Sequence, residues 1–381
     1  MPTLSQRISQ LHASPIREIL AVIQQPGMIS FAGGLPSADS FPAFDMAQVP
    51  ATLWQYGASE GESALREAIC IELRQLNFDC TPEQVLVLSG SQQGIDLVAK
   101  LMIDTGTAVA LESPTYLAAL QVFRLFGARF VTLDIARPRP ALDQASLCYV
   151  VPTFQNPTGG CYTHEQRKQL AQACEASGTV LFEDDPYRDL VYDACDRQPV
   201  ATYLQSGSFI YQGSFSKTLA PGLRLGYLLA SKDLVPYLTR LKQAADLHSN
   251  RLSQHLVLQA LRDPARGERL QRLQQHYRAK RDAFTDALQW HMRGLANWQT
   301  PPGGLFFWLT LAERIDTQAL LQQAIAQGVA FMPGEPFFHD GTSGLSHLRL
   351  NFSHASITDM DKGLRILRRL CEKALGIRQA G

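Results

Sequence analysis

Short apolar runs alternate along the chain with longer segments whose apolar residues recur every three or four positions. The short runs are rich in β-branched residues and predict strands at residues 85–88, 109–111, 130–133, 148–151, 179–182, 209–211 and 223–229. The helical spacing lies between several of them, at residues 92–103, 117–126 and 164–177. Helices of this length serve as crossovers between parallel strands, so the pattern predicts an α/β fold with a mainly parallel sheet covered on both faces.

The last two predicted strands differ from the others. Only residues 212–222 separate them, which is too short a connection for a crossover helix. We therefore expect these two strands to be antiparallel neighbours. The prediction is a mainly parallel seven-stranded sheet with one antiparallel strand.

The C-terminal third of the chain predicts a second, smaller α+β domain. Residues 267–292 carry apolar side chains at helical spacing amid many charges, which is typical of a long amphipathic helix. The sequence Pro301-Pro302-Gly303-Gly304 then interrupts the pattern. We expect an N-terminal segment at 1–44 that packs on the small domain, a large domain at 45–290 and the small C-terminal domain at 291–381.

Composition argues against several classes of protein. Among 381 residues, 35 Lys and Arg balance 35 Asp and Glu, so no net charge favours nucleic acid or an anionic membrane. Seven widely spaced cysteines argue against a disulfide framework, and His164-Glu165 lacks the second histidine of H-E-x-x-H, so we predict no metal site. The chain shows neither a signal peptide nor an apolar run long enough to span a bilayer. We expect a cytoplasmic protein without membrane partners.

Polar residues follow three of the predicted strands, where α/β sheets bind ligands. Ser89–Gly94 opens a helix, and its small residues predict either a phosphate site or a simple N-cap by a serine. Asn156-Pro157-Thr158-Gly159 by itself predicts a turn. The acidic run at residues 183–185 ends a buried strand, where carboxylates need a positive partner or a proton.

Lys217 is the candidate nucleophile. It lies in the short loop between the last two predicted strands, with Ser214 and Ser216 before it and Arg224 after it. Most lysines are solvated surface charges, which is the alternative here. A lysine desolvated at a strand end is nucleophilic, and the neighbouring hydroxyls and guanidinium suit an aldehyde that carries a phosphate.

These motifs together resemble the class I/II aminotransferases of the fold-type I pyridoxal-phosphate enzymes. The resemblance rests on an ordered set: Asn156-Pro157-Thr158-Gly159, Asp184 with Tyr187, Ser-x-Ser-Lys at 214–217, Arg224, and Leu348-Arg349-Leu350-Asn351-Phe352-Ser353. Further segments resemble the 2-aminoadipate, kynurenine and aromatic aminotransferase branch: Gly33-Gly34-Leu35-Pro36, Gln55-Tyr56-Gly57, Gly90-Ser91-Gln92-Gln93-Gly94, Pro114-Thr115-Tyr116 and 183–187. The resemblance extends from about residue 17 to 352.

The resemblance implies pyridoxal 5′-phosphate as cofactor and assigns a role to each matched residue. Lys217 would bind the cofactor covalently and move the α-proton, while Asp184 would pair with the pyridine nitrogen. Asn156 and Tyr187 would hydrogen-bond the phenolic oxygen, and Tyr116 would stack on the ring. The phosphate would be bound by hydroxyl, amide and guanidinium groups: Ser91, Gln92, Ser214, Ser216 and Arg224. Lys217, Asp184, Tyr187 and Tyr116 are the predicted catalytic residues.

The same resemblance implies a homodimer with shared active sites, because Tyr56 would complete the phosphate site of the neighbouring subunit. Arg349 would bind the substrate α-carboxylate, aided by Gly34 and Asn156; by pattern alone Arg349 is equally an arginine on an exposed edge strand. Arg17 would bind a distal carboxylate, or else is a surface arginine paired with a nearby acid. Apolar residues near these motifs suggest broad specificity, with 2-oxoglutarate as the expected acceptor: Phe31, Leu35, Phe306 and Phe352.

Three functions follow from these residues. The first is an aminotransferase (EC 2.6.1) that moves an α-amino group from an L-amino acid to a 2-oxo acid by a ping-pong mechanism. The second is another pyridoxal-phosphate enzyme, such as a racemase or lyase. The third is the effector-binding, aminotransferase-like domain of a transcription regulator. Since such regulators begin with a winged helix-turn-helix and the match here begins near residue 17, we expect a stand-alone enzyme.

Overall fold

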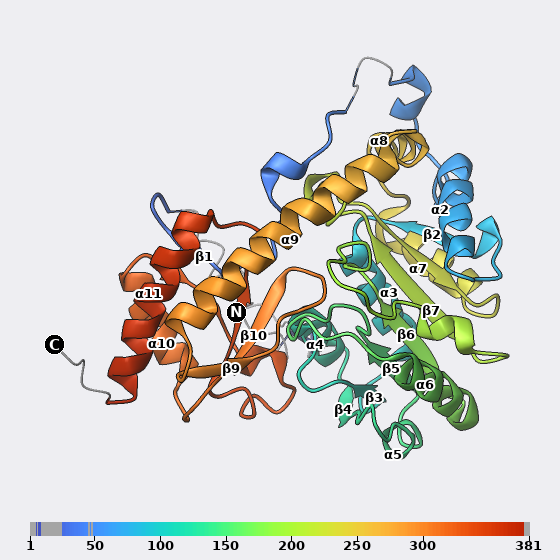
Figure 1. Cartoon of the computed structure of the whole chain (residues 1–381). Helices are drawn as coiled ribbons and strands as arrows, with labels where there is room; N and C mark the ends of the chain where they lie inside the picture. Colours follow the sequence, from blue (N-terminus) through green and yellow to red (C-terminus); the bar gives the residue numbers. More distant parts are fainter. Residues whose placement is uncertain (1–4, 6, 9–24, 45, 47–48, 377–381) are drawn as a thin grey trace.

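The computed structural model describes residues 5, 7–8, 25–44, 46 and 49–376. Arg17, the predicted contact for a distal carboxylate, lies outside these residues. Figure 1 shows a larger body built around a central sheet, a smaller body of helices and strands, and helix α9 running from one to the other. No helix in the described part of the chain is long and apolar enough to cross a membrane.

The larger body contains a seven-stranded sheet formed by described residues, with the strand order β2-β8-β7-β6-β5-β3-β4. Its strands are β2 (Val85–Leu88), β3 (Ala108–Leu111), β4 (Arg129–Thr132), β5 (Leu147–Val150), β6 (Val180–Asp184), β7 (Phe209–Ser214) and β8 (Gly226–Ala230). β8 runs antiparallel to both β2 and β7, while the other pairs are parallel. The predicted fold, with its one antiparallel strand, is confirmed.

Helices cover both faces of this sheet. They are α2 (Ser63–Gln75), α3 (Ser91–Met102), α4 (Leu117–Leu125), α5 (Arg139–Leu142), α6 (His164–Ser177), α7 (Val235–Asp246) and α8 (Arg251–Arg262). Successive strand residues belong to opposite cores: Val85 and Val87 pack with α2 and α8, whereas Leu86 and Leu88 pack with α3 and α4. Burial on both faces explains why these strands have continuous apolar sequences.

One predicted strand begins too early. Residues 223–225 were expected to be extended, but Pro221–Leu223 forms a short 3-10 helix and Arg224 has a left-handed backbone with φ of 49°. A left-handed residue interrupts extended geometry, so β8 starts only at Gly226. Other 3-10 helices are Ala38–Ser40, Ala51–Trp54, Pro82–Gln84, Val200–Tyr203 and Glu335–Phe337.

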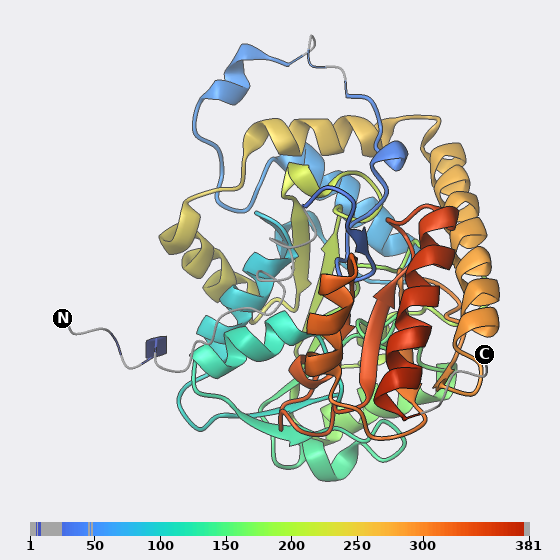
Figure 2. The ribbon, with the colours of Figure 1, turned by 90° about the vertical axis from the view of Figure 1, so that its left-hand side faces the viewer.

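The smaller body is an antiparallel sheet with helices on it. Its sheet order is β12-β13-β10-β9, and its elements are β9 (Ala296–Trp298), β10 (Phe306–Leu311), α10 (Thr317–Ala326), β11 (Val329–Ala330), β12 (Met332–Pro333), β13 (His347–Asn351) and α11 (Ile357–Ala374). Figure 2 shows the N-terminal strand β1 (Ile29–Ser30) beside these elements, where it pairs in parallel with β11. Helix α9 (Arg266–His291) confirms the predicted long helix. The domain boundaries stay a prediction.

Substitution of Gly213 would test how tightly the β7–β8 hairpin is packed. A Cβ at this position of β7 would clash with the ring of Tyr227, its partner on β8. Because this partly buried ring must move, we expect Gly213→Ala to lower the free energy of unfolding by about 1–3 kcal/mol. Urea unfolding measures the change.

Gly267→Ala is the matched control, since nothing lies within 4 Å of the added Cβ in helix α9. Alanine favours helix over glycine, so this variant should be stabilised by up to about 1 kcal/mol. Equal urea midpoints of unfolding for Gly213→Ala and Gly267→Ala would contradict the expected clash with Tyr227.

Candidate active site

A cavity of about 370 Å³ lies where the carboxyl ends of β5, β6 and β7 meet the smaller body. It brings together residues from separate parts of the chain that the sequence singled out: Gly34, Ser91, Gln92, Tyr116, Asn156, Asp184, Tyr187, Ser214, Ser216, Lys217, Arg224 and Arg349. Two predicted residues are missing from this set. Arg17 lies outside the described residues, and Tyr56 lies on the surface with 75% of its area exposed.

Lys217 presents its amine to this cavity. Its Nζ donates a hydrogen bond to the backbone oxygen of Gly34 at 2.8 Å. Loss of solvation, together with the positive charges of Arg349 and Arg224, lowers the pKa of Lys217 to about 8. A larger fraction of this amine is therefore neutral near pH 7 than for a surface lysine, which makes it the better nucleophile.

Asp184 ends β6 as a carboxylate that is only 3% exposed. Tyr149 Oη donates to its Oδ2 at 2.8 Å, and Gln212 Nε2 donates to its Oδ1 at 2.9 Å. Desolvation raises the pKa of Asp184 to about 6, against the lowering effect of the two hydrogen bonds. Among the described residues, no Lys, Arg or His lies within 4.0 Å of this carboxylate. Asp184 thus has two donors and no cation.

Tyr149 and Gln212 were missed in the sequence. Both lie inside strands that read as apolar, and the structure buries both completely. A hydroxyl or amide in a buried strand needs a hydrogen-bond partner, so these two residues could have indicated a buried polar group nearby. The partner was hidden because it lies on a neighbouring strand.

Arg224 and helix α3 together form a site for an anion. The helix begins at Ser91 after Gly90, whose φ is 86°, and no side chain caps it. A Cβ on Gly90 would lie 2.5 Å from Nη2 of Arg224, so only glycine lets the guanidinium approach the helix N-terminus. The free N–H groups and helix dipole favour an anion there, and the guanidinium adds a full positive charge. The serine N-cap alternative is wrong.

Arg349 reaches the cavity from β13 of the smaller body. Its guanidinium donates from Nη1 to Asn156 Oδ1 at 2.7 Å and from Nη2 to Ala32 O at 2.6 Å, and its Nε has no partner. It lies 4.2 Å from the ring centroid of Phe306 and is 3% exposed. No carboxylate in the described chain lies within 4.0 Å of it. A buried cation without a carboxylate favours an anionic ligand.

Two phenols complete the cavity wall. Tyr187 lines the cavity together with Asn156, and its ring centroid lies 5.8 Å from Lys217 Nζ. Burial raises the pKa of Tyr116 to about 12 and that of Tyr187 further, so both hydroxyls stay protonated and can donate. Of the apolar residues predicted near the substrate, Leu35 lines the cavity, whereas the others are fully buried in the core: Phe31, Phe306 and Phe352.

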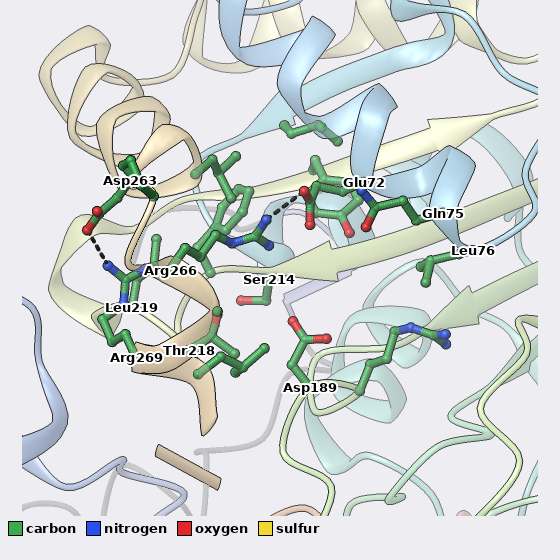
Figure 3. Close-up of a pocket in the computed structure, with 18 residues that line it drawn as sticks. Glu72, Gln75, Leu76, Asp189, Ser214, Thr218, Leu219, Asp263, Arg266 and Arg269 are labelled. Carbon is green, nitrogen blue, oxygen red and sulfur yellow. Dashed lines mark ion pairs between the residues drawn. The ribbon is translucent and has the colours of Figure 1, made fainter. Parts of the chain in front are cut away.

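A second, larger cavity of about 540 Å³ lies behind the Lys217 loop (Figure 3). Phe215, Thr218 and Leu219 face it, and the ion pairs Arg266–Glu72 and Arg269–Asp263 cross its wall. Lys217 does not line this cavity. Size therefore does not identify the active site; the reactive amine and the unpaired charges do.

The first cavity fits pyridoxal phosphate, the cofactor expected from the sequence. Gly90 lets the Arg224 guanidinium approach the N-terminus of helix α3, and the two together suit an anionic group. Asp184 lacks the cation that a protonated pyridine nitrogen would provide. Lys217 offers an amine of lowered pKa for the aldehyde.

Known proteins agree with this chemistry. The family model for aminotransferase class I and II matches residues 37–367. The 2-aminoadipate transaminase of Thermus thermophilus is 36% identical over 390 residues, covering 97% of this chain and 96% of that protein. The crystal structure of LysN, an α-aminoadipate aminotransferase from Thermus thermophilus complexed with N-(5′-phosphopyridoxyl)-L-leucine, has a TM-score of 0.89 and 34% identity, covering 98% of each chain.

A Pyrococcus horikoshii kynurenine aminotransferase superposes with a TM-score of 0.91 at 30% identity, covering 98% of this chain and 97% of that one. The match of the family model over most of the chain shows the family directly. The chain therefore belongs to the class I and II aminotransferases of fold type I and is a pyridoxal-phosphate-dependent transaminase.

Proposed function

We propose that this aminotransferase moves the α-amino group of an L-amino acid to a 2-oxo acid such as 2-oxoglutarate in two half-reactions at one site. One observation carries the proposal: the buried guanidinium of Arg349, without a carboxylate among the described residues, shares a cavity with the amine of Lys217. An α-amino acid and a 2-oxo acid each bring the missing carboxylate. The names of the relatives support acidic and aromatic donors.

The residues of the cavity have distinct proposed roles around the cofactor. When bound, pyridoxal phosphate supplies an electron sink for the pair released as the Cα–H bond breaks. Lys217 Nζ anchors the cofactor and then accepts and returns the Cα proton. Asp184 would pair with the pyridine nitrogen and keep it protonated, Asn156 and Tyr187 would hydrogen-bond the phenolic oxygen, and Tyr116 would contact the ring. Ser91, Gln92, Ser214, Ser216 and Arg224 bind the phosphate.

Arg349 sets the orientation of the substrate. Its planar guanidinium suits a bidentate pair with the α-carboxylate, and the Gly34 backbone and Asn156 lie next to that position. A carboxylate held at a fixed angle would present the Cα–H bond, rather than the bond to the carboxylate, for cleavage beside Lys217. Orientation thus favours deprotonation over decarboxylation. We also propose broad specificity, since Leu35 gives the cavity wall an apolar and partly exposed side chain.

We propose a homodimer with Tyr56 in the phosphate site of the partner. Trp54, Tyr56 and Leu247 expose 72%, 75% and 42% of their areas, and the Tyr56 ring packs edge-on against His248 at 5.8 Å. Exposed large apolar side chains that gather on one surface mark an interaction site. We also propose, as expected from the sequence, that Arg17 contacts the distal carboxylate of an acidic substrate.

Tyr149→Phe tests the control of Asp184 by its hydrogen bonds. A hydrogen bond to a charged group contributes about 1.5–3 kcal/mol, so its loss should raise the pKa of Asp184 by about one to two units above its value of about 6. Asp184 is anionic above its pKa, and a protonated ring nitrogen binds the anion. Cofactor affinity should therefore fall as pH decreases through this pKa, and the fall should begin at higher pH in the variant.

Titration of cofactor-free protein with pyridoxal phosphate between about pH 5 and 9, followed by absorbance, measures the shift. Tyr203→Phe is the control, because its hydroxyl contacts His164 away from the cavity. Identical pH dependence in the Tyr149 variant and the unmodified protein would show that this hydroxyl does not tune Asp184.

The half-reaction tests the transaminase chemistry itself. An L-amino acid added without a 2-oxo acid should convert the bound cofactor stoichiometrically, and 2-oxoglutarate should reverse the absorbance change. Lys217→Ala should bind cofactor without the lysine-linked absorbance band and lose nearly all turnover, because no other described amine lines the cavity. A racemase or lyase would give product without stoichiometric conversion. Failure across acidic, aromatic, basic and aliphatic amino acids would reject the proposal.

Arg349→Lys tests carboxylate recognition. Lysine keeps a charge but cannot form the bidentate pair, so we expect KM for the amino acid to rise about 10–100-fold, with a smaller change in kcat. Arg137→Lys is the control, since Arg137 lies on the surface beside Asp134. An unchanged KM would place the α-carboxylate elsewhere.

A further inference from the structure

Gln93 lies on the first turn of α3, next to the predicted phosphate contacts, but does not line the cavity. Its amide oxygen accepts hydrogen bonds from the Ser89 N–H at 2.9 Å and from Lys242 Nζ at 3.0 Å. Its amide nitrogen donates to Asp246 Oδ2 at 2.7 Å. Because the first two partners only donate and the carboxylate only accepts, these contacts determine the orientation of the amide. Gln93 thus joins the turn before α3 to helix α7.

The two α7 residues form an ion pair that is anchored on the same turn. The Lys242 side chain is completely buried, and its Nζ lies 2.8 Å from Asp246 Oδ1. Asp246 Oδ2 also accepts from Ser89 Oγ at 2.7 Å. Burial alone would raise the pKa of Asp246, but its donors Lys242, Gln93 and Ser89 prevail and lower it. The carboxylate therefore stays ionised, and a buried lysine needs it as a partner.

The anion site depends on the turn that this network holds. Gly90 follows Ser89 with a φ of 86°, and α3 begins directly after it. Among the described residues, the N–H groups of Ser91 and Gln92 have no acceptor. Both residues line the cavity together with Arg224. A shift of the turn would move these free N–H groups relative to the guanidinium, and a phosphate could no longer bond to all of them.

We propose that Gln93, held by Lys242 and Asp246, is a positioning residue that fixes the first turn of α3 for the phosphate of the cofactor. This inference rests on the phosphate site proposed above. The alternative is that the network only joins α7 to α3 and stabilises the fold. Pyridoxal, which lacks the phosphate, distinguishes the two. Loss of positioning weakens binding of pyridoxal phosphate alone, whereas a general loss of structure weakens binding of both compounds.

The test uses Gln93→Met, which keeps the length and the charge of the side chain but removes the hydrogen bonds of its amide. Cofactor-free protein is titrated with pyridoxal phosphate and, separately, with pyridoxal, and the lysine-linked absorbance band measures each Kd. We expect Kd for pyridoxal phosphate to rise about tenfold, as for one lost hydrogen bond to a charged group. Kd for pyridoxal should change by less than about twofold.

Gln169→Met is the matched control. Gln169 also lies on a helix and donates to a carboxylate, Glu165 Oε1, at 2.8 Å, but on the exposed side of α6. This variant should bind both compounds as the unmodified protein does. Lys242→Met is a second test, because it removes a donor to Gln93 and leaves Asp246 without its cation. It should again weaken binding of pyridoxal phosphate more than binding of pyridoxal.

Equal losses of affinity for the two compounds in Gln93→Met, or no loss for pyridoxal phosphate, overturn the positioning role. Arg224→Gln separates this result from failure of the phosphate site itself, since it removes the charge that the site is proposed to use. A selective loss for pyridoxal phosphate in Arg224→Gln but not in Gln93→Met overturns only the role of Gln93. No selective loss in either variant overturns the phosphate site and the positioning role together.

Discussion

The buried carboxylate of Asp184 is the constraint on which the active site depends. Its place at the end of β6 sets it between two neighbouring strands, and the parallel register puts Gln212 of β7 directly beside it while Tyr149 reaches it from β5. Gln212 must turn its amide nitrogen toward the carboxylate, so its oxygen remains unsatisfied. That oxygen in turn leaves no space for a side chain on Gly94 of α3. The buried carboxylate thus constrains which side chains can occupy positions on three strands and one helix.

The antiparallel strand β8 places Lys217 and Arg224 close together. The amine of Lys217 and the anion site at Arg224 both lie at the carboxyl end of β7. If the next strand were parallel, the chain would first have to cross to the other end of the sheet. The β7–β8 hairpin instead returns at once, with Lys217 in its connection and Arg224 just before β8. The left-handed backbone of Arg224 then directs the guanidinium toward Gly90. Hairpin geometry thus brings an amine of lowered pKa and a guanidinium into one cavity.

Local patterns predicted what depends on local sequence. The strands, the long α9 helix and the antiparallel pair follow from periodicity and connection length. The left-handed Arg224 was missed because an apolar run reads as continuous strand. Tyr149 and Gln212 were missed because their partner is set by register between strands that are far apart in sequence. The contact between Asn156 and Arg349 joins residues 193 positions apart, and only the packing of the two bodies determines it.

That contact also shows that the cavity is built by both bodies. Arg349 comes from the smaller body, yet it bonds the N-terminal segment at Ala32 and the large-body loop at Asn156. Its charge is buried against the rings of Phe306 and Phe337, at 4.2 and 5.1 Å from their centroids. These rings favour a cation, but no carboxylate among the described residues pairs with it. Arg349 of the smaller body and Lys217 of the larger body thus line one cavity. The placement of one body against the other therefore sets the position of this guanidinium relative to the amine of Lys217.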